Sequence, residues 1–99
     1  MPKVYVVHDQ GRVNLLPAEE YGELKVCLNG RFSHHMNKRV FGHLRESLRD
    51  ITRDDFLIPM GNPAYIAMAG GIIMEKLGSM KILQWDNQTQ QYTVVEITA

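Results

Sequence analysis

The chain has 99 residues, a formal net charge of zero and a single cysteine. This length allows one hydrophobic core but not two, so we expect a single domain over residues 1–99. A lone cysteine excludes an intramolecular disulfide, and no apolar run approaches the roughly 18 residues that a membrane span needs. The composition therefore favours a cytoplasmic protein without a membrane partner, and the balanced charge favours no class of partner.

The first part of the chain predicts two strands. Residues 3–8 are mostly β-branched or aromatic and predict the first strand, and a turn at residues 17–20 precedes the second strand at residues 24–28. Asn29-Gly30 ends the second strand, because both residues tolerate a positive φ. We expect Leu24, Val26 and Leu28 to face one way, with Lys25 and Cys27 on the other face.

A helix is predicted next, from Asn37, a suitable N-cap, to Asp50. Apolar residues at helical spacing form its predicted buried stripe: Val40, Phe41, Leu44, Leu48 and Ile51. A polar connection over residues 52–55 leads to the next strand.

Residues 56–97 predict a strand, a second helix, a strand and a final hairpin strand. Phe56 to Met60 is apolar on both faces, Asn62 can cap the helix with Pro63 at its first position, and Gly78 can end it. Residues 64–74 carry no charge, so we expect this helix to be buried on most of its circumference. The strands at residues 80–85 and 92–97 complete a ββαβαββ two-layer sandwich of the α/β (α+β) class, with a mixed sheet and a parallel βαβ crossover.

The turn at Gly61-Asn62 is a candidate anion or nucleotide site, because a helix N-terminus after a glycine turn presents free backbone donors. A basic segment strengthens this hypothesis. Residues 31–53 hold six basic and two acidic residues, and Lys38, Arg45 and Arg49 share one predicted helix face. The alternative is a capped helix beside a solvated charged surface, which we favour because there is no P-loop lysine and no GxGxxG pattern.

No catalytic or metal-binding constellation is evident, so we expect neither an enzyme nor a cofactor. His34, His35 and His43 lack the spacing of a metal motif, and we expect a surface loop. Cys27 is expected to be a buried structural thiol. Asp54 and Asp55 are adjacent and therefore poorly placed as a converging acid–base pair.

Trp85 and Tyr92 are close together in the predicted hairpin and can stack across its strands. If the pair is exposed it would anchor a protein interface, and if buried it would be a core pair. Both alternatives remain open from the residues alone.

Several segments together resemble a group of small bacteriophage proteins. The segments are KVYVV, EYGEL, DDFLIPMGNPAYIA, LQWD and YTVVEI, and they extend over most of the chain. The resemblance implies a phage-encoded protein that acts in the cytoplasm of an infected bacterium, and it assigns no functional residue.

The leading hypothesis is a non-enzymatic interaction protein that binds a host or phage protein, as a homodimer, with Trp85 and Tyr92 at the interface. The alternative is a nucleic-acid or nucleotide-binding protein that uses Gly61, Asn62, Lys38, Arg45 and Arg49. A structural component of the virion is a third hypothesis.

Overall fold

The computed structural model describes residues 1–11, 14–30 and 37–99, without the side chain of Asn37. Its elements, in chain order, are β1 (Lys3–Asp9), the 3-10 helix η1 (Leu16–Tyr21), β2 (Glu23–Asn29), α1 (Asn37–Ser47), β3 (Phe56–Ile58), α2 (Pro63–Leu77), β4 (Ser79–Asp86) and β5 (Gln91–Thr98). The predicted turn at residues 17–20 is thus part of a short helix, whereas the other elements match the expected order.

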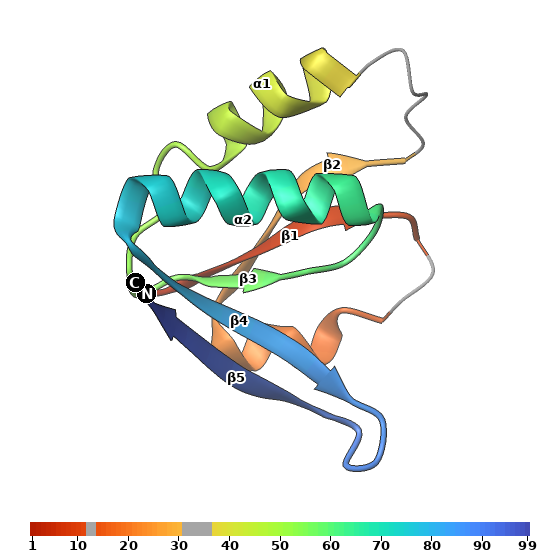
Figure 1. The fold of residues 1–99 in the computed structure, drawn as a ribbon. Helices are drawn as coiled ribbons and strands as arrows, with labels where there is room; N and C mark the ends of the chain where they lie inside the picture. The colour runs from red at the N-terminus through yellow and green to blue at the C-terminus, as the bar shows by residue number, and fades with distance from the viewer. Residues whose placement is uncertain (12–13, 31–36) are drawn as a thin grey trace.

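The strands form a five-stranded mixed sheet in the order β2-β1-β3-β4-β5. The first four strands of this order are parallel, and β5 runs antiparallel to β4. Helices α1 and α2 cover one face of the sheet and η1 lies on the other (Figure 1). The predicted α/β (α+β) class and mixed sheet are confirmed.

The core has two parts, one on each side of the sheet. Tyr5 and Val7 of β1 pack toward the helices, whereas Val4 and Val6 pack toward η1. All four side chains are buried. A strand that is covered on both faces needs a continuous apolar run, and the sequence of β1 supplies it.

Helix α2 begins and ends where the sequence predicts, but it is less buried. The Asn62 side chain accepts a hydrogen bond from the Ala64 N–H at 2.8 Å, and Gly78 adopts the left-handed conformation at the other end. Only Tyr65, Ala69 and Ile73 are buried. The uncharged run therefore covers the sheet with one face, and its other positions are intermediate or exposed among the described residues.

Helix α1 is shorter than predicted. The Leu48 N–H still bonds the Leu44 carbonyl at 2.9 Å, but the Arg49 and Ile51 N–H groups bond carbonyls three residues earlier, which ends the helix at Ser47. Of the predicted stripe, Phe41 alone is exposed, at 39%. The predicted N-cap contact of the Asn37 side chain lies outside the described residues.

In β2, Leu28 packs with Cys27 on the helix side of the core, not with Leu24 and Val26 as predicted. Both sides of this strand are covered near its end, so strict alternation of buried and exposed positions is lost.

Within the described ranges, no helix has the length and apolar character needed to cross a membrane.

Candidate interaction surface

Strands β4 and β5 form a hairpin in which Trp85 lies opposite Tyr92. The ring centroids are 5.0 Å apart at an interplanar angle of 69°, an edge-to-face pair. Tyr92 is 5% exposed and Trp85 is 38% exposed. The Trp85 indole N–H donates to the Asn87 side-chain oxygen at 2.9 Å, which fixes the ring orientation. The pair is therefore half buried, between the two sequence-based alternatives.

An apolar hollow of about 350 Å³ adjoins this pair. Its lining residues come from β3, the connection that follows β3, and the hairpin: Ile58, Pro59, Met60, Leu83, Gln84, Trp85 and Tyr92. Gln84 is the one polar side chain of this lining. Burial raises the pKa of the Tyr92 hydroxyl, and the Tyr92 carbonyl accepts a hydrogen bond from the Tyr21 hydroxyl at 3.0 Å. This hydrogen bond joins Tyr92, which lines the hollow, to η1.

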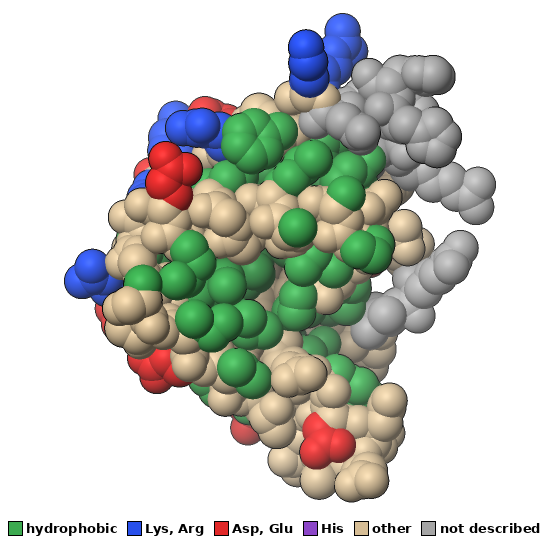
Figure 2. Space-filling model, viewed as in Figure 1, with side chains coloured by type: hydrophobic (Ala, Val, Ile, Leu, Met, Phe, Trp, Pro, Cys, Tyr) green, Lys and Arg blue, Asp and Glu red, His purple; other side chains and the backbone are tan. Residues whose placement is uncertain are grey.

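Strand β5 also exposes aliphatic side chains on both of its faces. Val94 is 46% exposed, and Val95 and Ile97 are each 38% exposed. Figure 2 shows hydrophobic side chains gathered over α2 and the adjoining hairpin on the helix side of the sheet. A solvated strand face is normally polar, so this hairpin is an unusually apolar surface.

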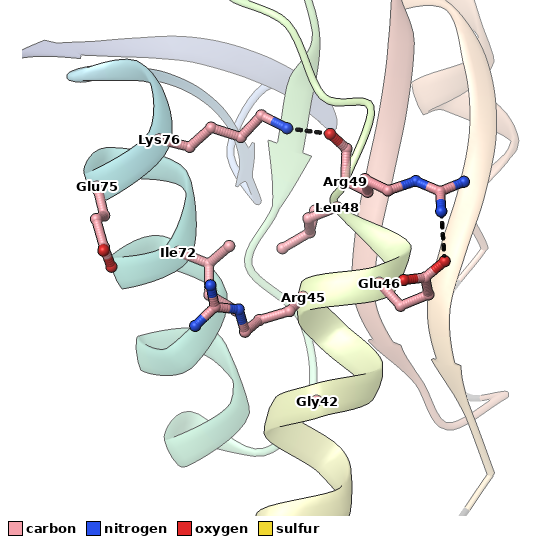
Figure 3. A pocket seen from close by; sticks show the side chains of 8 residues that line it. All are labelled: Gly42, Arg45, Glu46, Leu48, Arg49, Ile72, Glu75 and Lys76. Atoms are coloured by element: carbon pink, nitrogen blue, oxygen red, sulfur yellow. Dashed lines mark hydrogen bonds and ion pairs between the residues drawn. The ribbon is translucent and has the colours of Figure 1, made fainter.

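Two of the three basic residues, Arg45 and Arg49, line a groove of about 580 Å³ between α1 and α2 (Figure 3). Arg49 is 2.8 Å from the Glu46 carboxylate and 3.8 Å from that of Asp50, whereas the Arg45 guanidinium lies 5.8 Å from the Phe41 ring centroid. Arg49 also follows the end of α1, so it does not share a helix face with Lys38, which is exposed in the first turn. The carboxylates of Glu46 and Asp50 thus offset the positive charge of Arg49.

Gly61 and Asn62 lie at the opposite end of α2 from this groove. Lys76 of the groove is 14 residues after Asn62, and 14 residues of α-helix span roughly 20 Å. The Asn62 side chain and carbonyl are engaged with the backbone of the first turn of α2. The structure therefore does not bring Gly61 and Asn62 together with Arg45 and Arg49.

Of the cysteine, aspartate and histidine residues considered from the sequence, Cys27 and Asp55 are buried in the fold and Asp54 and His43 are exposed. Cys27 is 4% exposed, and burial raises the pKa of its thiol to about 11. Asp55 is buried and accepts backbone hydrogen bonds from Lys3 and Thr52, whereas Asp54 is exposed. His43 is exposed on α1, and His34 and His35 lie outside the described residues. Among residues 1–11, 14–30 and 37–99, no cluster of three metal-ligating side chains occurs.

The predicted proximity of Trp85 and Tyr92 is confirmed, but the sequence analysis did not predict the hollow beside them or the exposed aliphatic side chains of β5. Pro59 and Met60 contribute to the hollow because the chain leaves β3 at Ile58. The adjacent pair Val94-Val95 was the available signal, since two consecutive valines place apolar side chains on both faces of a strand.

These features define a small α/β protein with a mixed sheet and an apolar, half-exposed hairpin. Residues 2–99 match the model of the phage Pam3 gp32-like protein family, and the chain belongs to this family. The resemblance to small bacteriophage proteins is thereby confirmed. A search of the curated proteins and a search of the solved structures each found no match.

Proposed function

We propose that this phage protein is a non-enzymatic interaction protein that binds a host or phage protein in the cytoplasm of the infected cell, and that it acts as a homodimer. The observation that carries the proposal is the half-exposed Trp85 ring, which forms an edge-to-face pair with the buried Tyr92 and borders an apolar hollow.

This arrangement has the properties of a binding hot spot. Tryptophan and tyrosine dominate the energetics of many interfaces, and hot spots lie in packed pockets from which water is excluded. Here Trp85 is held by its pair with Tyr92 and by its bond to Asn87, so little side-chain freedom is lost on binding. The hollow is lined by Pro59, Met60 and Leu83 and would accept an apolar side chain of the partner.

The test is a pull-down from lysate of infected host cells, followed by calorimetry with the captured partner. Truncation of a hot-spot residue costs about 2 kcal/mol or more, so Trp85→Ala should weaken the affinity by at least about tenfold. Phe41→Ala is the matched control, because Phe41 is an aromatic residue of almost equal exposure, 39% against 38%, on a different element. Equal effects of the two variants on affinity, with both still folded by circular dichroism, would contradict the proposal.

Nucleic-acid or nucleotide binding is the competing function. Its two elements, the Gly61-Asn62 turn and the Arg45 and Arg49 side chains, are at opposite ends of α2. Arg49 has two carboxylate neighbours, and the Arg45 guanidinium lies over the Phe41 ring, so both cations already have partners within the chain. These features favour the protein-binding proposal over this alternative.

A further inference from the structure

Strand β5 forms one edge of the sheet, where it carries one charged residue, Glu96, and is contacted by η1 near Tyr92. It is eight residues long, contains no proline, and exposes Val94, Val95 and Ile97. Natural proteins shield such edges with charges, prolines, bulges or covering elements. The opposite edge, β2, carries the exposed charges of Glu23 and Lys25 and is contacted by α1 and η1. Both edges are contacted by η1, but β5 has one charged residue where β2 has two, and its exposed side chains are largely aliphatic.

The backbone geometry shows which groups of β5 are available. The Ala99 N–H donates to the Gly78 carbonyl at 2.9 Å, in the same register that places Ile97 opposite Met80 and Val95 opposite Ile82. Because antiparallel ladders alternate, the N–H and C=O groups of odd-numbered residues point toward β4 and those of even-numbered residues point outward. The outward row therefore belongs to Tyr92, Val94, Glu96 and Thr98. The Tyr92 carbonyl already accepts from Tyr21, but a carbonyl oxygen has two lone pairs.

We propose that β5 pairs antiparallel with β5 of a second copy about a two-fold axis, so that two five-stranded sheets become one continuous sheet. This inference rests on the homodimer of the proposed function and specifies its interface. In the pairing, Val94 lies opposite Glu96 of the second copy, Tyr92 lies opposite Thr98, and Val95 meets its own counterpart on the axis.

Charge and strand length select this register over its neighbours. Moving the axis to Glu96 would place two carboxylates directly opposite each other, which is destabilising. Moving it to Val94 would place Thr98 opposite Gln90, a turn residue with a φ of 57°. In the proposed register, Glu96 instead lies between Val94 of the second copy and Lys81 of its own β4.

A second copy is the occupant that this edge fits. In this register the strand is complementary to itself. Glu96, its one charged residue, does not lie opposite Glu96 of the second copy. β-Branched side chains lie opposite one another: Val95 with Val95, and Thr93 with Ile97. The net charge of the chain is zero, so two copies do not repel each other at long range. The pairing places a neighbouring strand beside the apolar side chains on both faces of β5.

Position-specific disulfide formation tests the register. Cysteines at a non-hydrogen-bonded antiparallel pair have Cα atoms about 4.5 Å apart, within the range that a disulfide spans. Val95→Cys should therefore give a covalent dimer after mild oxidation, seen on a non-reducing gel. Thr93→Cys is the matched control on the same face of the same strand, and it should remain monomeric because its counterpart is about four residues distant along the pairing. The native Cys27 is 4% exposed and should contribute little background in either variant.

Light scattering on the unaltered protein and on Val95→Lys completes the test. The unaltered protein should have twice the mass of one chain. Val95→Lys should be a folded monomer, because two ammonium groups would face each other on the axis while an exposed position tolerates the lysine within one chain. A monomeric unaltered protein, a dimer that Val95→Cys does not cross-link, or equal cross-linking by Thr93→Cys would each overturn the inference.

The same variants separate this inference from partner binding. Val95→Lys retains Trp85 and the hollow, so its affinity for the captured partner can be compared with that of Trp85→Ala. If Trp85→Ala loses partner binding but Val95→Cys forms no cross-link, the pairing of β5 is refuted and the binding proposal stands. An intact cross-link with unchanged partner binding in Trp85→Ala would refute the binding proposal alone.

Discussion

At the scale of single residues, Gly61 shows why a turn that resembles an anion site is needed by the fold. The residue has a φ of 105°, and β1 packs directly against it. The Met60 carbonyl just before it accepts the His8 N–H at 3.1 Å, so the turn is also joined to β1 by the backbone. The positive φ and the close packing against β1 therefore both require glycine at this position, whether or not a ligand binds there.

Gly61→Ala should destabilise the protein strongly. A Cβ at this position would meet the side chain of His8 and would lie 2.8 Å from its carbonyl oxygen, in a backbone conformation that alanine disfavours. We expect a loss of about 2–3 kcal/mol in the free energy of unfolding, measured with urea. Gly42→Ala is the control: nothing lies within 4 Å of its Cβ position in α1, so the change should stabilise by about 0.5–1 kcal/mol. A neutral effect of Gly61→Ala would show that the packing against His8 is not tight.

At the scale of the elements, several charged side chains join the ends of helices to their neighbours. The Arg53 guanidinium donates two hydrogen bonds to the Leu77 carbonyl at the end of α2, at 3.0 and 3.2 Å. Lys76 donates in turn to the Arg49 carbonyl after α1. Cations at helix C-termini satisfy free carbonyls and complement the helix dipole. Part of the basic character of residues 31–53 therefore has a structural explanation.

Asp55 joins three parts of the chain, and its removal should be costly. One carboxylate oxygen accepts the Lys3 N–H at 2.8 Å at the start of β1, and the other accepts the Thr52 N–H at 2.8 Å before β3. Asp55→Ala would remove the acceptor of two partly buried hydrogen bonds, so we expect a loss of about 1–3 kcal/mol in thermal or urea unfolding. Its exposed neighbour provides the comparison, since Asp54→Ala should change stability by less than about 0.5 kcal/mol. Similar effects at the two positions would argue against this anchoring role.

At the scale of the whole molecule, the features predicted from sequence were those with local signals. The caps of α2 at Asn62 and Gly78 and the strand at residues 3–8 depend on nearby residues, and the structure has them as expected. The exposure of Phe41 and the position of Leu28 depend on which distant elements cover them, which no local pattern contains. The outer face of α2 was misjudged for the same reason.

The candidate surface around Trp85 and Tyr92 was only partly predictable from sequence. The pairing of Trp85 with Tyr92 follows from a hairpin, but the hollow also needs β3 to lie beside β4. The open edge of β5 is a property of the strand order, which was not fixed by the sequence pattern. The hairpin pattern therefore predicts the Trp85–Tyr92 pair, whereas the strand order determines which residues lie around it.

Stability of the whole molecule should fall in alkaline solution because buried acids ionise more easily once the chain unfolds. Burial raises the pKa of Cys27 from its ordinary value of 9.0 to about 11, and burial also raises the pKa values of Tyr5 and Tyr92. Between these two Cys27 values the unfolded chain binds fewer protons than the folded one, so the free energy of unfolding decreases as pH rises. Below pH 9 this contribution is fully present.

Urea midpoints at pH 8, 10 and 11 would measure this loss. The shift of Cys27 alone corresponds to about 2–3 kcal/mol over the full interval, to which Tyr5 and Tyr92 add in the same direction. Cys27→Ala should start less stable, because it leaves a small cavity in the core, but it should lose less stability between pH 8 and 11. Parallel pH curves for the two proteins would show that the Cys27 thiol ionises as readily in the folded chain as in the unfolded one, contrary to its burial between β2 and the helices.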